Sequence, residues 1–382
     1  MKKLNILLAF ILVLALLLTA CASPAKPAES SSQAASSEQA SPSVSQTASE
    51  ETKESDAQTV QFTDFSGNVV TIPAHANKIA ALVGPSFEKT LVLGQADRVA
   101  VSMKLGKWAQ EVYPAAKNLK TVENPQEPNV EELASLGVDL VFFWQTPEQI
   151  KKMSDLGIPA LSMNSFEAKW SSIDEFVEIS KKDIQLYGDA LGSDAQAKAE
   201  KWVQYFDEKV KYVLSRTSKL TKDQIKKVYY IRSSASDGLE AFLNDSTPHG
   251  LVEIAGGDFV TKDAEGKNNY GTVTMEQVIE WNPDVIFLGR VDSTDLITKN
   301  SQWDSINAVK NGQIYLVPNG VFMWDNSSER VLNLLFLAKT LHPELFEDLD
   351  MVSEIQQYYS TFYNYDLSAE NAQRIIDRLP PA

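Results

Sequence analysis

The sequence is poor in cysteine, histidine and basic charge. Cys21 is the only cysteine among 382 residues, which excludes disulfides within the chain, cysteine-ligated zinc and iron–sulfur clusters. The 35 lysines and arginines face 51 acidic residues, and the formal net charge of -16 argues against nucleic acid, whose phosphates require clustered basic groups. His75, His249 and His342 lie far apart without metal-ligand spacing, so we expect no metal site.

No hydrophobic run reaches the roughly 20 residues that a membrane-spanning helix needs. The apolar run from Ile6 to Leu18 follows Lys2 and Lys3 and precedes small residues, which predicts an export signal over residues 1–20. The stretch Leu18-Thr19-Ala20-Cys21 resembles a bacterial lipobox, in which the cysteine is lipidated and becomes the new N-terminus. Two or more acyl chains anchor a protein stably, so we expect an extracytoplasmic protein held on the outer face of the cell membrane.

The segment that follows, residues 21–58, is mostly Ser, Ala, Glu, Gln and Pro. Such a composition cannot bury enough apolar surface to order itself, which predicts a flexible tether after the lipidated cysteine. Its length and serine content look like those of Gram-positive surface lipoproteins.

A unit of one helix and one buried strand occurs twice, 145 residues apart. The two copies are residues 129–142 and 274–287. Each copy opens with the spacing of a helix capping box, Asn129 with Glu132 and Thr274 with Gln277. The strand of each copy is apolar throughout, as expected for a strand covered by helices on both faces.

Strands alternate with helices around both copies, which predicts an α/β fold with two lobes, each a parallel sheet flanked by helices. Long helical patterns between the lobes predict one long connecting helix, in which Trp202, Phe206 and Val210 share a face. We also expect an amphipathic helix at 301–310 and a helical tail from Arg330 to Arg378 that packs on the second lobe. The predicted divisions are 1–20 signal, 21–58 lipidated cysteine and tether, 59–172 first lobe, 173–218 helical region with the interlobe helix, and 219–382 second lobe with C-terminal helices.

These features together resemble the helix-linked class of periplasmic binding proteins, which includes those for vitamin B12, ferric siderophores and haem. The resemblance covers about residues 61–379. Besides the two repeat copies it rests on short fragments that occur in the family's order: Asp64, Gly67, Ile72-Pro73, Trp303, Ala308-Val309-Lys310-Asn311-Gly312 and Tyr315. It implies a monomeric, non-enzymatic protein that binds a small molecule and delivers it to the permease dimer of an ABC importer.

In this family one acidic side chain on each lobe contacts arginines of the importer's membrane subunits. Residue by residue, those positions fall on Glu131 and Glu276, which occupy equivalent places in the two repeat copies. Both would lie in the exposed first turn of a helix, near its positive end. A solvated first-turn glutamate without a partner is the alternative reading.

Ligands of parallel sheets bind beyond the carboxyl ends of the strands, and this rule selects the candidate ligand-binding residues. They are Lys104, Trp144, Arg232, Tyr270, Arg290 and Trp324. The basic members favour an anionic ligand, and the aromatic ones would form flat walls for a large chelate. Arginines that pair with neighbouring acids, and tryptophans covered in the core, are the competing readings.

We therefore expect an iron(III)-siderophore or a similar anionic metal chelate as ligand, with cobalamin, haem and molybdate or tungstate left open. A ligand contact of His249, the extent of lobe closure and the identity of the permease stay undecided. The chain has no nucleophile elbow, phosphate loop or zinc-protease motif, so we expect neither an enzyme nor a cofactor. A surface adhesin that uses the lobes as a scaffold is the alternative from another class.

Overall fold

The computed structural model describes residues 58–165, 168–266 and 268–382. The expected signal peptide, Cys21 and almost all of the tether lie outside the described residues. None of the helices within those ranges combines the length and the apolarity needed to cross a bilayer.

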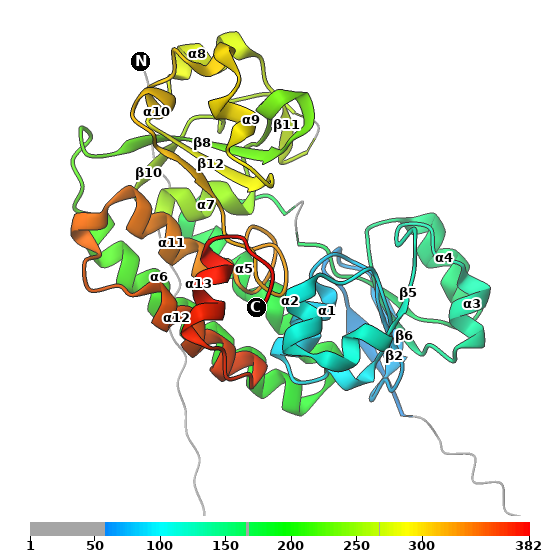
Figure 1. Ribbon diagram of the computed structural model, residues 1–382. Helices are drawn as coiled ribbons and strands as arrows, with labels where there is room; N and C mark the ends of the chain where they lie inside the picture. The colour runs from blue at the N-terminus through cyan, green and yellow to red at the C-terminus, as the bar shows by residue number, and fades with distance from the viewer. Residues whose placement is uncertain (1–57, 166–167, 267) are drawn as a thin grey trace, which may run out of the picture. The chain divides into compact units, whose positions relative to one another are not determined.

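The chain opens with an antiparallel hairpin of β1 (Thr59–Thr63) and β2 (Val69–Pro73) and continues into a parallel sheet in the order β5-β4-β3-β6-β7 (Figure 1). The strands of this sheet are β3 (Ile79–Ala81), β4 (Val99–Ser102), β5 (Lys120–Thr121), β6 (Leu140–Phe143) and β7 (Ala160–Ser162). The accompanying helices are α1 (Ser86–Val92), α2 (Lys107–Val112), α3 (Val130–Ser135) and α4 (Pro147–Asp155). The Asp64 carboxylate accepts hydrogen bonds from the amides of Asn68 and Ser162, which ties the hairpin to β7.

The second sheet follows the order β11-β9-β8-β12-β13, with β10 also paired to β8. Its strands are β8 (Lys226–Ser233), β9 (Glu240–Phe242), β10 (Gly257–Phe259), β11 (Tyr270–Thr272), β12 (Val285–Arg290) and β13 (Ile314–Leu316). Its helices are α7 (Thr247–Ile254), α8 (Met275–Trp281), α9 (Asp295–Thr298) and α10 (Asn307–Lys310). Strands β9 and β11 run antiparallel to their neighbours, so this sheet is mixed at one edge.

The repeat extends to the contacts that close each half. The Asp139 carboxylate accepts from the Lys78 amide at 2.9 Å, and the Asp284 carboxylate accepts from the Lys227 amide at 3.0 Å. In turn, Lys78 Nζ donates to the carbonyl of Leu136 at the end of α3, and Lys227 Nζ donates to the equivalent carbonyl at the end of α8. The start of the leading strand in each half is thus joined to the repeated helix and strand in the same way.

The helix ends of the two copies also match. Asn129 and Thr274 both cap the third residue of their helices, and Thr274 with Gln277 forms the full reciprocal capping box. Beyond α3 the backbone turns at Gly137 with a φ of 71°, and after α8 Asn282 takes the same left-handed conformation with a φ of 44°.

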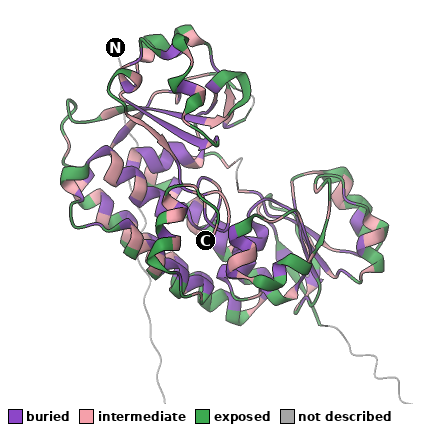
Figure 2. Ribbon diagram, in the orientation of Figure 1, coloured by how far each residue is buried: buried purple, intermediate pink, exposed green. Residues whose placement is uncertain are grey.

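Between the sheets, α5 (Ile173–Leu191) and α6 (Ser193–Thr217) pack together as a hairpin around Gly192. At about 1.5 Å per residue α6 is about 37 Å long, which agrees with the long connecting helix that was expected. Trp202, Phe206 and Val210 are all buried on one face of it. Figure 2 shows buried segments alternating with exposed ones along this helix pair. The tail forms α11 (Arg330–Leu341), α12 (Met351–Tyr358), a π-helical turn η6 (Tyr359–Tyr363) and α13 (Ala369–Ile376).

Two local expectations need correction. Residues 301–310 form two separate short pieces, the 3₁₀ turn η4 (Ser301–Trp303) and α10, because Ile306 between them is extended. The tail does not pack on the second lobe alone. It contacts α6 and α7 through α11, reaches α1 through η6, and the carbonyl of Leu379 accepts a hydrogen bond from the Trp108 indole in α2.

A buried ion triad joins three of these helices. Asp183 on α5 contacts Lys89 Nζ of α1 at 2.6 Å and Arg330 Nη2 of α11 at 2.8 Å, and all three side chains are at most 4% exposed. Burial alone would raise the pKa of Asp183, but the two cations outweigh it and lower that pKa.

Candidate functional site

Arg232 and Arg290 lie at the carboxyl ends of neighbouring parallel strands. Strand β8 carries Arg232 next to its last residue, Ser233, and Ser233 is in register with Arg290 at the end of β12. This is the edge at which ligands of parallel sheets bind, so the expected placement of both arginines is observed.

Asp325 engages Arg290. Its carboxylate lies 3.1 Å from Nη2 and 3.3 Å from Nε, and its side chain is 2% exposed. Burial opposes the charge of Arg290, but the charge and hydrogen bonds of Asp325, with smaller contributions from other groups, raise the pKa of the guanidinium. Arg290 therefore stays charged and oriented, and its charge is balanced within the protein.

Glu240 and Tyr270 hold Arg232. The Glu240 carboxylate lies 2.9 Å from Arg232 Nη1, and the guanidinium carbon lies over the Tyr270 ring, 3.9 Å from its centroid. The hydroxyl of Ser233 donates to the same carboxylate oxygen. Arg232 Nε is buried without a hydrogen-bond partner, so part of the guanidinium has unused donor capacity.

Beside Arg290 lies a pocket of about 200 Å³ at the ends of β12 and β13. Residues that line it include Arg290, Asn319, Trp324, Asp325 and Arg378. Trp324 has no exposed surface, and its indole Nε1–H has no hydrogen-bond partner. The Oδ1 atom of Asn319 is also buried without a hydrogen-bond partner. The pocket thus offers polar groups that the protein itself leaves unsatisfied, which native structures rarely do.

Arg378 is a lining residue that the sequence did not suggest. It donates to the carbonyls of Gly289 and Val317 at 2.5 and 3.0 Å, and its Nη2 lies 3.8 Å from the Asp292 carboxylate. Arg378 follows α13 near the end of the chain, far from any strand, so a search of strand ends could not find it.

The first-lobe candidates lie apart from this pocket. Lys104 is exposed after β4, whereas Trp144 is half-buried after β6 with its indole nitrogen unpartnered. Among the described residues, no hydrogen bond or ion pair joins either of them to Arg232 or Arg290. Their ligand contacts stay predictions.

The histidines occupy packed positions. His249 is buried, stacks on Phe259 with ring centroids 5.0 Å apart, packs against Trp170, and bonds to the Glu253 carboxylate through Nε2. His342 Nε2 lies 3.0 Å from the carbonyl oxygen of Gly256. Within the described ranges, no three acidic or histidine side chains gather as metal ligands.

Glu131 and Glu276 occupy the same position, the second residue of α3 and of α8, and both are exposed. Backbone hydrogen bonding in the first turn of α8 lowers the pKa of Glu276, with a further contribution from Thr274. The neighbouring Glu132 is instead paired with Lys120 at 2.7 Å. Both predicted docking acids therefore keep their carboxylates available to solvent.

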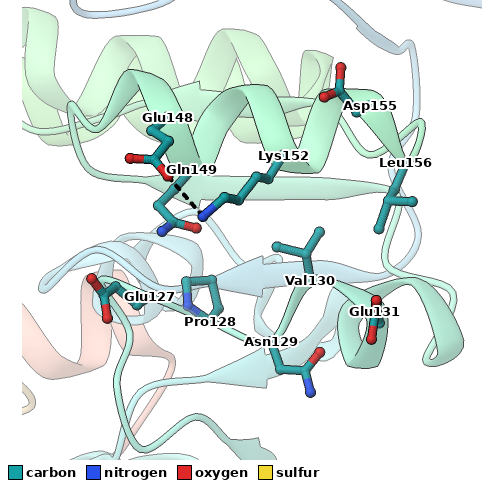
Figure 3. A pocket seen from close by; sticks show the side chains of 10 residues that line it. All are labelled: Glu127, Pro128, Asn129, Val130, Glu131, Glu148, Gln149, Lys152, Asp155 and Leu156. Atoms are coloured by element: carbon teal, nitrogen blue, oxygen red, sulfur yellow. Dashed lines mark ion pairs between the residues drawn. The ribbon is translucent and has the colours of Figure 1, made fainter.

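A surface pocket of about 600 Å³ adjoins Glu131 (Figure 3). It is lined by the start of α3 and by α4, with Glu127, Glu131 and Asp155 around the apolar side chains of Val130 and Leu156. The Glu148–Lys152 ion pair of α4, at 3.0 Å, lies on its far wall. This surface is acidic, as a partner with basic side chains would require.

Sequence comparison defines the class of protein. A profile of the periplasmic binding protein family matches residues 79–320, more than half of the chain, and the chain belongs to that family. It is a substrate-binding protein of the kind that serves ABC importers, and because the family consists of solute-binding proteins, the expectation that it is not an enzyme is confirmed.

Three individual relatives align over most of this chain. The molybdate-binding protein MolA of Haemophilus influenzae is 26% identical over 82% of this chain and 93% of its own length. The ABC transporter substrate-binding lipoprotein YvrC of Bacillus subtilis is 27% identical over 76% and 87%, and the iron(3+)-hydroxamate-binding protein FhuD of the same organism is 25% identical over 70% and 82%.

Solved structures confirm the predicted fold. A periplasmic solute-binding protein from Veillonella parvula superposes with a TM-score of 0.69 at 27% identity, covering 84% of this chain and 97% of that one. MolA with bound molybdate gives a TM-score of 0.71 at 22% identity, covering 81% and 99%.

Proposed function

We propose that this protein is a lipid-anchored, extracytoplasmic capture protein that binds an anionic ligand and delivers it to the permease of an ABC importer. The anchor rests on the lipobox-like stretch ending at Cys21 and on the serine-rich segment behind it, which favours a Gram-positive type of tether. Relatives named as lipoproteins support it. The protein acts as a monomer, with the lobes divided at residues 172 and 218 as the sequence predicts.

The observation that carries the choice of an anionic ligand is the pair of guanidinium groups at the 200 Å³ pocket. Arg290 and Arg378 border a pocket whose buried indole N–H at Trp324 has no partner within the protein. Since Asp325 and Asp292 balance both cations, the pocket carries no net formal charge, and selectivity would come from oriented hydrogen-bond donors.

The size of this pocket, about 200 Å³, favours a small metal oxyanion such as molybdate or tungstate over a whole siderophore. Molybdate binding by MolA, a relative that aligns over most of this chain, supports the same choice.

The ferric chelate predicted from the sequence is the second candidate, and a different cluster favours it. Arg232, half-buried over Tyr270, presents a cation and an aromatic face together, which suits the flat, oxygen-rich surface of a chelate. Iron(3+)-hydroxamate-binding FhuD supports this alternative.

The test is a tryptophan-fluorescence titration of the purified protein with molybdate, tungstate, sulfate, a ferric hydroxamate, cobalamin and haem. We expect saturable, micromolar or tighter binding of one anion. Loss of that binding in Trp324→Phe and Arg290→Lys, with Arg232→Lys unaffected, would assign the oxyanion pocket, and the reverse pattern would assign the chelate site. Binding of no anion, or binding unchanged in all three variants, would refute the proposal.

Delivery is tested separately. Glu131→Gln and Glu276→Gln should leave the affinity for the ligand unchanged and lower uptake into membrane vesicles that contain the cognate importer, because each acid would orient the protein on one permease subunit. Glu280→Gln, an exposed glutamate in the same helix as Glu276, is the matched control. Full uptake in the double variant would exclude these acids from docking.

A further inference from the structure

Residues 319–328, here called the site loop, connect β13 to α11 and supply four of the groups that line the 200 Å³ pocket. Trp324 contributes the unpartnered indole N–H, and Asp325 orients Arg290. Any shift of this loop therefore displaces both the free donor and the anchored guanidinium.

A buried carboxyl group holds the first half of the loop. Glu329 Oε1 accepts from the amide of Val321 at 3.3 Å, and Oε2 accepts from the amide of Phe322 at 3.1 Å. The hydroxyl of Tyr359 donates to Oε1 at 2.8 Å, and Glu329 has no exposed surface.

A second buried carboxyl group holds the other end. Glu88 of α1 accepts from the amide of Ser328 at 3.1 Å and from the hydroxyl of Tyr363 at 2.9 Å. Tyr359 and Tyr363 belong to the same π-helical turn, η6. Both ends of the site loop are thus fixed in the same way. A buried glutamate accepts hydrogen bonds from loop amides, and a tyrosine hydroxyl donates a hydrogen bond to that glutamate.

The loop packs closely against its surroundings at Gly320 and Phe322. A Cβ on Gly320 would overlap the Glu329 carboxyl and the Tyr359 hydroxyl, and on the other side the Phe322 ring lies within 3.4 Å of the place where a Cβ on Gly84 would be. These carboxyls therefore position the loop together with its own turns, in which the amide of Asn326 donates to the carbonyl of Met323 and the amide of Gly320 donates to that of Phe322.

We propose that Glu88 and Glu329 are positioning residues, which fix the site loop and through it the placement of Trp324 and Asp325 in the pocket. This rests on the proposed function only in treating the pocket as the ligand site. The hold on the loop itself is independent of any ligand.

The two acids also make that hold sensitive to pH near neutrality. Burial raises the pKa of Glu88 to about 7, opposed by the Ser328 amide, Lys89 and Tyr363. Burial and the neighbouring Glu88 raise the pKa of Glu329 to about 8, opposed by Phe322, Tyr359 and Val321. Tyr358 also faces both acids, Tyr187 faces Glu88, and Arg330 and Asp183 are the charges that face Lys89. Deprotonation strengthens the amide hydrogen bonds but places two like charges close together.

The experiment measures hydrogen-exchange protection of the 321–328 amides in the full-length protein from pH 6 to pH 9. Glu329→Gln keeps one acceptor oxygen, so we expect protection of the Val321 and Phe322 amides to fall by about tenfold or more. Glu88→Gln should act on the Ser328 amide, and the exposed Glu344→Gln should have no effect. Protection within twofold of the parent chain in both variants would overturn the proposal.

In Tyr359→Phe the quantity to measure is the pH at which protection changes, which a purely structural role of Glu329 would not alter. This variant also keeps the test valid if the glutamine variants fold poorly. Tyr359 lowers the pKa of Glu329, so its loss should move the midpoint of the pH dependence of protection to higher pH. An unchanged midpoint would also overturn the proposal. Affinity for molybdate, measured in parallel, separates the two ideas, because failure to bind any anion with the exchange pattern intact would refute the proposed function alone.

Discussion

Replacement of Asp183 by asparagine should be among the most destabilising single changes that keep side-chain volume. The carboxylate lies between Lys89 and Arg330 with all three groups buried, so its loss leaves two unpaired buried cations. Breaking such a cluster costs about 3–5 kcal/mol. At an unfolding entropy of about 2.1 cal/mol/K per residue, 1 kcal/mol corresponds to roughly 1.5 °C for the folded part of this chain, so Tm should fall by about 4–7 °C.

The assay is calorimetric or circular-dichroism unfolding at pH 7, with Asp189→Asn as control. Asp189 lies on the same helix and is exposed, and its carboxylate accepts a hydrogen bond from the Gln196 side chain, so its replacement should cost less than about 0.5 kcal/mol. Equal Tm values for the two variants would refute the reasoning.

A compensated variant separates charge from shape. In Lys89→Met, Asp183→Leu, Arg330→Met all three charges are replaced by apolar groups, and most of the lost stability should return. Burial lowers the pKa of Lys89, so this lysine loses its proton, and with it the unpaired charge, more readily as pH rises. We therefore expect Asp183→Asn to cost less stability at pH 9 than at pH 7. A triple variant as unstable as the single one would mean that packing, not charge, is responsible.

Three further outcomes are expected. Between pH 5 and pH 9 the parent protein should lose stability relative to the Glu88→Gln, Glu329→Gln double variant. Carboxyls with raised pKa values favour folding only while they are protonated, and this contribution is lost as pH rises through about 7 for Glu88 and about 8 for Glu329. Parallel curves of Tm against pH for the two proteins would contradict this. Gly188→Ala should lower the free energy of unfolding in urea by about 1–3 kcal/mol, since its Cβ would lie 2.9 Å from that of Ala199, whereas Gly106→Ala meets open space and should be neutral. Asn282→Ala should cost about 1 kcal/mol at its left-handed φ, and no change in Tm would argue against strain there.

The sequence predicted those parts of the fold whose pattern is local. The apolar runs of β6 and β12 are buried throughout, and the capping residues Asn129 and Thr274 begin their helices as expected. Strands β9 and β11 escaped notice because each has only three residues and is partly exposed, so neither carries a clear hydrophobic period.

The sequence predicted where the two arginines of the candidate site lie, but not which acids pair with them. Strand ends located Arg232 and Arg290, but Glu240 lies across a turn and Asp325 is 35 residues further along, so that only the folded chain brings these acids to the arginines. Trp324 was predicted as a flat wall with a covered core position as the alternative, and in the structure it has no exposed surface. The buried pair of Glu88 and Glu329 has no sequence signal, since isolated glutamates ordinarily indicate solvent-exposed positions.

The paired contacts of Lys78 with Asp139 and of Lys227 with Asp284 have a consequence for the ancestry of the molecule. Each half uses one lysine to close a helix end and one aspartate to hold the start of a strand, at equivalent places in two otherwise divergent sequences. Such agreement in both residue type and atom-level role is what duplication of a single ancestral half would leave. Among the described residues, the antiparallel edge and the helical tail have no counterpart in the first half, and of that material only Arg378 lines the pocket at the ends of β12 and β13.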